Sequence, residues 1–269
     1  MIDNSIQSIA IGSFDGIHLA HQNLISRVEA LIVIERNLGV LTAGYRRTKF
    51  IDKPIYFYHF DNISSLLASE FINMIVLDFP NLKKIVVGYD FAFGYKKEGD
   101  SKLLQKLFHW EVEVIDEIFY QNISIHSKKI KEYLKDGNIK IVNKLLGREY
   151  ECDGVVIKGQ GIGAKEIMAT INLKFSNYIL PKNGVYATKT LMNNQYLPSI
   201  TFIGHRVSSD GKFAIETHII DKNIIYNSKK CTIKWLDFIR DNKKFDSLSD
   251  LKNQIKKDIK IAKAFSDER

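Results

Sequence analysis

The segment Ser8-Ile-Ala-Ile-Gly12-Ser-Phe-Asp-Gly16-Ile-His18-Leu-Ala-His21 indicates the fold of the first half of the chain. Its apolar run, Ser8 to Gly12, predicts a buried strand, and a glycine turn follows at once. The residues from His18 to Leu31 then have the spacing of a helix. A strand that passes through a tight turn into a helix is typical of an α/β unit.

The same segment carries two histidines that suit a polyphosphate ligand. His18 and His21 lie three residues apart, so both side chains fall on one face of the first helical turn. Gly12 and Gly16 allow a tight turn and close approach of a ligand, and the N–H groups at the helix start point toward the same space. A bare pair of histidines could equally be half of a metal site or two surface residues. The strand-turn-helix setting and Phe14-Asp15-Gly16 favour the phosphate site.

Alternating strand and helix patterns extend this unit along the first half of the chain. Strands are predicted at Ser8–Gly12, Leu38–Thr42, Pro54–Phe60, Lys84–Gly88 and Glu111–Ile115. Helices are predicted at His18–Leu31, Ser64–Leu77, Ser101–Trp110, Lys128–Asp136 and Ile139–Leu146. Gly137 and Gly147 close the last two helices as left-handed cap residues. The alternation predicts a doubly wound parallel sheet flanked by helices.

A second glycine- and aromatic-rich segment follows a buried strand, at Val87-Gly-Tyr-Asp90-Phe-Ala-Phe-Gly94. A loop at the carboxyl end of a strand is where open α/β sheets bind ligands. Phe91 and Phe93 could pack against a flat ring of a ligand, or they could anchor the loop in the core. The residues alone leave both alternatives open.

The pattern changes after Gly147. Short strands are predicted at Tyr150–Lys158, Ala169–Phe175, Val185–Met192, Gln195–Phe202, Phe213–Ile220 and Cys231–Trp235. Strands without helices between them predict a small antiparallel barrel, here six-stranded. A terminal helix follows Ser247, with apolar residues on one face. We therefore predict two domains, residues 1–147 and 148–269.

The barrel half carries residues that suit phosphoryl transfer. Thr170 and Asn172 lie two apart, so a strand would direct both toward a hard cation that shields phosphate. Transfer to an alcohol also needs a carboxylate that accepts the hydroxyl proton, and Glu216 is the candidate. We expect Glu216 inside the barrel, where desolvation would raise its pKa. The alternative for Glu216 is a surface carboxylate on an edge strand, and His218 shares its face without an assigned role.

The first half resembles two known motifs. Gly12 to His21 is similar to the G-x-F-D-G-x-H-x-G-H motif of the nucleotidyltransferase superfamily, with Ala20 in place of a glycine. Gly88 to Gly94 resembles the G-x-D-F-x-F-G segment of bacterial bifunctional riboflavin kinase/FAD synthetases. The resemblance implies catalytic roles for His18 and His21. It implies nucleotide or flavin binding by Gly12, Phe14, Asp15, Gly16, Asp90, Phe91, Phe93, Gly94 and Ser127.

The second half resembles the riboflavin kinase domain of the same family. The order of Gly159-Gln-Gly161-Ile-Gly163, Ala169-Thr-Ile-Asn172, Glu216-Thr-His218 and Arg240-Asp-Asn carries this resemblance. It implies that Gly159, Gly161 and Gly163 cover the ATP phosphates and that Glu216 is the catalytic base. Thr170 and Asn172 would hold Mg²⁺, and Asn172 and Arg240 would also contact the substrates.

The chain departs from the family pattern at several positions. Ile34-Glu-Arg-Asn37 stands where the family usually has P-H-P, and Ala169-Thr-Ile-Asn172 replaces P-T-A-N. In the family segment I-S-S-T-x-x-R, Lys128 replaces the threonine and Lys131 the arginine. Lysine does not reproduce the bidentate phosphate contact of arginine. The kinase half therefore keeps its polar pair better than the first half keeps its nucleotide contacts.

These observations predict a flavin-synthesising enzyme. The barrel would phosphorylate riboflavin to FMN with ATP, and the first domain would adenylylate FMN to FAD. One alternative limits catalysis to the kinase, with a degenerate first domain. Another is a basic RNA-binding protein, since the formal net charge is +8, but the scattered lysines speak against a binding stripe.

The amino-acid composition indicates the class of protein and the expected compartment and partners. With 269 residues, 45% hydrophobic and 26% charged, the chain is typical of a globular protein. Its two cysteines, Cys152 and Cys231, form no C-x-x-C pair, and a reducing cytoplasm is the expected compartment. We expect small-molecule partners, namely ATP and flavins, with no nucleic acid and no membrane. The expected state is a monomer or a weak homo-oligomer.

Overall fold

The computed structural model describes residues 5–36, 39–158, 168–207, 210–221 and 228–267. The chain divides into two compact units, Met1–Lys129 and Ile130–Arg269. A parallel sheet with helices in the first half and a closed antiparallel barrel with a terminal helix in the second confirm the predicted fold class. The boundary predicted between Gly147 and Arg148 lies later than this division and stays a prediction.

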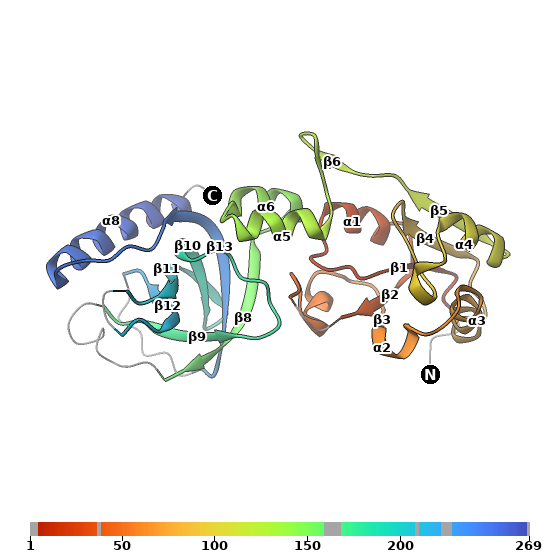
Figure 1. The fold of residues 1–269 in the computed structure, drawn as a ribbon, viewed down its shortest axis with the longest axis horizontal. Coiled ribbons are helices and arrows are strands. Elements are labelled where there is room, and N and C mark those ends of the chain that lie inside the picture. Colours follow the sequence, from red (N-terminus) through yellow and green to blue (C-terminus); the bar gives the residue numbers. More distant parts are fainter. Residues whose placement is uncertain (1–4, 37–38, 159–167, 208–209, 222–227, 268–269) are drawn as a thin grey trace. The chain divides into compact units, whose positions relative to one another are not determined.

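The first unit is built on one five-stranded parallel sheet (Figure 1). Its strands are β1 (Ser8–Gly12), β2 (Ala30–Glu35), β3 (Ile55–His59), β4 (Lys84–Gly88) and β5 (Glu111–Ile115), in the order β3-β2-β1-β4-β5. The helices are α1 (Leu19–Ile25), α2 (Phe60–Ile63), α3 (Ala68–Asp78) and α4 (Ser101–Leu107), with the 3₁₀ helices η1 (Gly44–Lys49) and η2 (Tyr95–Lys97). A short hairpin, β6 (Phe119–Tyr120) and β7 (Ile123–Ser124), follows the sheet.

Helices cover both faces of this sheet. Ile9 of β1 belongs to a buried cluster that includes Phe71 of α3 and Leu104 of α4. Ala10, the next residue of β1, belongs to a second cluster with Leu24 of α1. Successive residues of a strand point to opposite faces, so β1 is buried on both sides.

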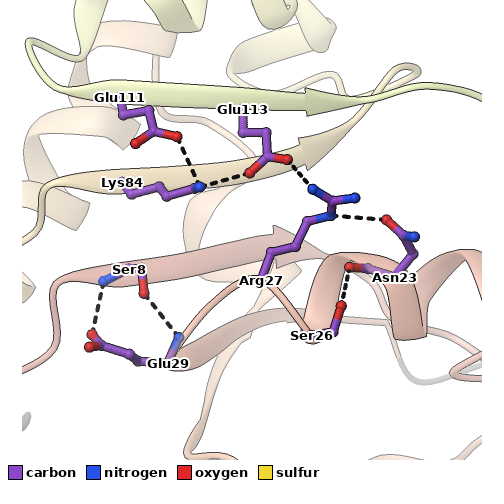
Figure 2. A network of polar contacts seen from close by, with 8 residues as sticks. All are labelled: Ser8, Asn23, Ser26, Arg27, Glu29, Lys84, Glu111 and Glu113. Atoms are coloured by element: carbon purple, nitrogen blue, oxygen red, sulfur yellow. Dashed lines mark hydrogen bonds and ion pairs between the residues drawn. The ribbon is translucent and has the colours of Figure 1, made fainter.

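Ion pairs connect the neighbouring strands β4 and β5 with the turn after α1 (Figure 2). Lys84 of β4 contacts Glu111 and Glu113 of β5, at 2.9 and 2.8 Å. Arg27, which follows α1, pairs with Glu113 and also donates to Asn23. Glu113 therefore receives two cations from two different elements.

Two predicted elements in this unit were wrong. The helix predicted over His18–Leu31 ends at Ile25, and Ala30–Glu35 forms β2 instead. The run Ala30-Leu-Ile-Val is buried on both faces, and such a short apolar run has no period that separates strand from helix. Residues 39–42, predicted as part of a strand, form bends around a single bridge at Val40.

The second unit is a closed six-stranded barrel in which all neighbouring strands are antiparallel (Figure 1). Its strands are β8 (Tyr150–Ile157), β9 (Ile171–Phe175), β10 (Gly184–Met192), β11 (Gln195–His205), β12 (Phe213–Ile219) and β13 (Lys230–Arg240). The order around the barrel is β10-β11-β12-β9-β8-β13. Before it come α5 (Ser127–Lys135) and α6 (Ile139–Leu146), and α8 (Leu248–Asp267) ends the chain.

Hydroxyl groups fill part of the barrel interior. Thr188 lies 2.8 Å from both Ser199 and Thr201, and Thr201 lies 2.8 Å from Thr217. All four side chains are buried. Buried hydroxyls need partners, and here each hydroxyl supplies one to a neighbouring strand.

Helices cover part of the outer surface of the barrel. Ala262 of α8 is buried with Ala187 and Ile200, while Ile255 and Ile259 pack against the same cluster. Because Ala187 alternates with interior residues of β10, this cluster lies outside the barrel. The outer face therefore has a covered part and a part that remains accessible.

Candidate active sites

The order of the parallel strands marks where a ligand would bind the first unit. From β1 the chain moves outward through β2 to β3, and β4 and β5 then lie on the other side of β1. The loops after β1 and β4 therefore leave the sheet in opposite directions at its carboxyl edge. Ligands of open α/β sheets bind at such a switch point. Both motifs predicted from the sequence, after Gly12 and after Gly88, begin there.

The loop after β1 has an unusual backbone. Phe14, Gly16 and Ile17 have φ of 45°, 92° and 43°, so two residues other than glycine adopt a left-handed conformation. The Phe14 and Ile17 side chains are both 1% exposed and belong to the core beneath the sheet. Core packing therefore holds the strained turn in one shape.

His18 and His21 lie together at the end of this loop. His18 is the N-cap of α1, and its Nδ1 accepts a hydrogen bond from the backbone N–H of His21 at 3.2 Å. Because Nδ1 accepts, the proton of the neutral imidazole is on Nε2. The two rings stack at 3.5 Å between centroids and 16° between planes. The predicted pair is thus brought together.

Asp15 connects three segments around the same loop. Its Oδ1 accepts hydrogen bonds from the N–H groups of Leu41 and Thr42, at 2.8 and 3.1 Å. Its backbone carbonyl accepts from Ser127 Oγ at 2.7 Å, at the start of α5. Asp15 and Ser127 therefore fix the shape of the site. Direct binding of a nucleotide by either residue stays a prediction.

Arg47 is a residue of this edge that the sequence did not single out. Its side chain is 1% exposed, with Nη1 3.7 Å from Glu35 Oε1 and 3.1 Å from the Gly44 carbonyl oxygen. Burial lowers the pKa of Arg47, and the charges of Asp15 and Glu35 oppose that effect. No sequence signal distinguished Arg47 from the solvated lysines and arginines around it.

The loop after β4 is anchored by its aromatic residues. Phe93 is buried in the core cluster, and Phe91 stacks on it at 5.4 Å. Gly94 has φ of 76°, and a Cβ there would meet the Ala68 backbone nitrogen at 2.8 Å. These core contacts agree with the alternative in which Phe91 and Phe93 anchor the loop in the core. Asp90 is exposed in the turn before them. Ligand binding by these residues stays a prediction.

In the second unit, strand register brings the predicted base and metal ligand together. Glu216 of β12 lies directly opposite Asn172 of β9. Residues opposite each other on antiparallel strands direct their side chains to the same face. The expectation that Glu216 lies inside the barrel was wrong. Ile215 and Thr217 are buried in the interior, so Glu216 between them faces outward.

Arg206 contacts Glu216 on this outer face. Its Nη1 donates to Glu216 Oε1 at 3.2 Å, and Nε and Nη2 bind Asp210 at 3.0 and 2.8 Å. Partial burial raises the pKa of Glu216, and the charge and hydrogen bond of Arg206 oppose the rise. Arg206 was missed because it lies in a loop without a motif of its own.

A cavity of about 470 Å³ is lined in part by Asn172, the strand partner of Glu216, and by Arg206, its ion-pair partner. It is lined by Ile157, Lys158, Asn172, Leu173, Lys174, Phe175, Leu180, Arg206, Phe213, Ala214 and Ile215. Cations and apolar side chains thus share one cavity beside Glu216. Such a mixture suits a ligand that has both a flat apolar part and a phosphate.

The remaining predicted residues of the second unit lie in different settings. Thr170 is exposed and immediately precedes β9. Gly159, Gly161 and Gly163 lie outside the described residues. Arg240 Nη2 binds the buried Asp258 of α8 at 2.8 Å, and its Nε contacts the same carboxylate. The contact of Arg240 with a substrate stays a prediction.

Known relatives extend over almost the whole chain. A bifunctional riboflavin kinase/FMN adenylyltransferase of Buchnera aphidicola (from Acyrthosiphon pisum) is 35% identical over 97% of this chain and 94% of its own length. The chain belongs to the bifunctional riboflavin kinase/FMN adenylyltransferase family. The Escherichia coli K12 member is 27% identical over 96% of this chain and 92% of its own.

Family models and a solved structure agree with this membership. Residues 146–266 match a riboflavin kinase model, and residues 47–129 match an FAD synthetase model. A crystal structure from Streptococcus pneumoniae, described as a macrolide-efflux protein, has a TM-score of 0.84 and 26% identity. It covers 98% of this chain, which covers 97% of that protein. Among the residues that the structure describes, no helix is long and apolar enough to cross a membrane.

The segment in which this chain departs from the family's I-S-S-T-x-x-R pattern forms the start of α5. Ser127, the retained hydroxyl of the family segment, binds the Asp15 carbonyl at the first turn of α5. Lys128 is exposed and Lys131 is half-buried on the same helix. Lys128 directly follows Ser127, and Lys131 lies one turn further along α5.

Proposed function

We propose that this protein phosphorylates riboflavin to FMN and adenylylates FMN to FAD, using ATP in both steps. Family membership supports both activities. The observation that carries the kinase assignment is the register that sets Glu216 opposite Asn172 beside a cavity. The observation that carries the second activity is the stacked His18–His21 pair at the switch point of the sheet.

In the kinase reaction, Glu216 accepts the proton of the riboflavin primary hydroxyl. The hydroxyl oxygen forms a bond to the γ-phosphorus of ATP, and the bond to the ADP oxygen breaks. Arg206 holds the Glu216 carboxylate at 3.2 Å and fixes its direction. The raised pKa of Glu216 makes it a better proton acceptor than an ordinary carboxylate.

Thr170 and Asn172 are the residues that would hold Mg²⁺. Their side chains offer the hydroxyl and amide oxygens that this hard cation prefers, and Mg²⁺ commonly takes few protein ligands alongside phosphate oxygens. When bound, Mg²⁺ would neutralise charge on the transferred phosphate.

In the adenylyl transfer, an FMN phosphate oxygen attacks the α-phosphorus of ATP in line, and pyrophosphate leaves. His18 and His21 stabilise the charge that develops on the leaving group. The Nε2–H of His18 is the donor that its tautomer provides. A covalent enzyme intermediate is not required.

The alternative with kinase activity alone rests on Lys128 and Lys131, where the family has threonine and arginine. Lysines keep the positive charge of arginine but not its bidentate geometry. We therefore propose that FAD synthesis is the slower of the two activities.

We further propose a cytoplasmic monomer or weak homo-oligomer that acts on small molecules and not on nucleic acid. Cys152 and Cys231 are both buried and are not joined to any cysteine by a disulfide, as suits a reducing compartment.

A single incubation tests the assignment. Purified protein with riboflavin, ATP and Mg²⁺ should convert riboflavin to FMN, and FAD should appear more slowly, as followed by chromatography. Complete absence of FAD from added FMN would leave the kinase alone. Absence of FMN would overturn the proposed function.

A further inference from the structure

His218 has no part in the chemistry described above, although it lies two residues from Glu216 on β12. Interior residues Thr217 and Ile219 flank it, so His218 shares the outer face of the barrel with Glu216. The two side chains therefore follow each other along the same accessible surface.

The ladder between β9 and β12 stops just where the predicted metal ligands begin. Its register pairs Glu216 with Asn172 and Thr217 with Ile171, and β9 starts at Ile171. The next residue toward the N-terminus is Thr170, for which the strand provides no paired position.

His218 continues the connection by its side chain. Its Nδ1 lies 2.8 Å from the carbonyl oxygen of Ala169. A carbonyl oxygen only accepts, so Nδ1 donates, in the neutral tautomer as well as in the imidazolium.

This bond acts on the peptide group that contains the Thr170 nitrogen. The peptide between Ala169 and Thr170 is planar, so holding its oxygen also fixes the direction of the Thr170 N–Cα bond. The Cβ of Thr170 can then move only by rotation about that bond, and the start of β9 at the next residue restricts this rotation.

We propose that His218 is a positioning residue that orients Thr170 toward the Mg²⁺ and phosphate of the kinase site. This inference rests on the proposed kinase function and adds one element to it. The side chain of His218, on the neighbouring strand β12, orients the Thr170 hydroxyl. It does so at a position where the hydrogen-bond ladder between β9 and β12 has already ended.

The test compares His218→Ala with His218→Asn in the full-length protein. Asparagine offers an N–H donor near the place of Nδ1, whereas alanine offers none. We expect His218→Ala to raise the Mg²⁺ concentration for half-maximal FMN formation about fivefold. This is the change that loss of one exposed hydrogen bond would cause. His218→Asn should restore most of the loss.

A second readout needs no bound metal. Hydrogen exchange of ligand-free protein should be faster in the peptide that holds residues 168–175 in His218→Ala, and near normal in His218→Asn. Ser228→Ala is the matched control, because Ser228 Oγ also donates to a backbone carbonyl, that of Lys230, at the start of β13. It should leave both readouts unchanged.

A double-mutant cycle with Thr170→Ala decides whether His218 acts through Thr170. If it does, His218→Ala adds almost no further loss of FMN formation to Thr170→Ala. If the losses of FMN formation caused by the two substitutions were fully additive, or if His218→Ala left the Mg²⁺ requirement unchanged, this inference would be overturned. The proposed kinase function would not be affected by either result. A wild-type protein that makes no FMN would overturn the proposed function and this inference with it.

Discussion

At the scale of single residues, the Glu216 carboxylate has both a proposed catalytic role and a defined neighbourhood. We expect Glu216→Gln to abolish FMN formation while riboflavin binding stays nearly intact. Glutamine keeps the shape of the side chain but cannot take the proton. Loss of a general base costs about 10²–10⁴-fold in rate. Chromatography of FMN and equilibrium binding of riboflavin give the two measurements.

The same protein contains the control for this variant. FAD formation from added FMN should be unchanged in Glu216→Gln, because His18 and His21 lie in the other unit. Retention of most of the kinase rate would show that another group accepts the proton.

Site residues that lie within motifs could be proposed from the sequence, and residues without a motif could not. Asn172 and Glu216 are far apart in the sequence, so the pairing of their strands could not be predicted from it. The resemblance to the family nevertheless indicated both residues as site candidates. The face of Glu216 was misjudged because a barrel strand has two half-buried faces, and alternation alone does not say which is inside. Arg206 and Arg47 carry no motif, and only the folded chain brings them to Glu216 and Asp15.

At the scale of elements, the clamp between Arg240 and Asp258 joins β13 to α8. Asp258 is 1% exposed and receives Nε and Nη2 of Arg240. We expect Asp258→Ala to destabilise the barrel by about 3 kcal/mol, because it leaves a partly buried guanidinium without its anion.

Denaturant unfolding with fluorescence detection would measure this change. A Trp110→Phe background leaves Trp235, which is fully buried in the barrel, as the sole tryptophan. Asp250→Ala on the exposed side of α8 is a control expected to have a much smaller effect. A stability of Asp258→Ala equal to the control would contradict the clamp.

The ion pairs of Figure 2 make a second prediction at this scale. Glu113→Gln should destabilise the first unit by about 1 kcal/mol, since Glu113 is shared by Lys84 and Arg27. Glu111→Gln is the matched control, because within the described part of the chain the Glu111 carboxylate pairs only with Lys84, and it is 61% exposed. Its effect should be smaller, and both effects should shrink at high salt.

The pH dependence of this contribution has a defined sign. The hydrogen bond from Lys84 lowers the pKa of Glu113 below its ordinary value. The contribution of Glu113 is therefore present at neutral pH and is lost as the pH falls through the folded-state pKa. Thermal unfolding at pH 7 and pH 3 would measure it, and an equal difference between variant and wild type at both values would contradict it.

The prediction of helices and strands failed where one apolar run was compatible with both a helix and a buried strand. The run from Leu24 to Val33 is apolar enough to continue α1, but the chain turns after Ile25 and enters β2. A strand buried on both faces lacks the alternation that identifies a half-buried strand. The barrel strands, by contrast, were located within a few residues, except that β13 extends five residues beyond the predicted end at Trp235.

At the scale of the whole molecule, the predicted boundary can be tested with two fragments. A fragment from Arg148 holds the whole barrel and α8, so we expect it to fold and phosphorylate riboflavin. A fragment from Ile130 also keeps α6, whose Asn143 binds the Trp235 carbonyl and the Tyr150 N–H. Ile139, Val142, Leu145 and Leu146 of α6 are all buried.

We therefore expect the longer fragment to be more stable by at least about 3 kcal/mol. Denaturant unfolding and FMN formation give the comparison. Two inactive, insoluble fragments would indicate one interdependent unit rather than two domains.

The two activities should also separate by mutation. His18→Ala with His21→Ala should stop FAD formation and leave FMN formation untouched, because the pair belongs to the first unit alone. In the unmutated protein, FAD formation should be measurable but slow, with FMN accumulating from riboflavin. A missing charged contact costs about 2–4 kcal/mol in a transition state, and Lys128 and Lys131 offset part of it.

Chromatography of both products in one time course is the measurement. FAD formation that survives the double histidine change would show that the adenylyl-transfer site lies elsewhere.

The two sheets differ in what they expose to another chain. The barrel is closed and has no edge strand, whereas the parallel sheet ends at β3 on one side and β5 on the other. Glu111 and Glu113 place charge on β5, but β3 reads Ile55-Tyr-Phe-Tyr-His59, which is aromatic and nearly uncharged. Such an edge is a template for strand addition. Once both units have folded, intermolecular strand addition at high concentration would therefore begin at β3, and the closed barrel would take no part in it.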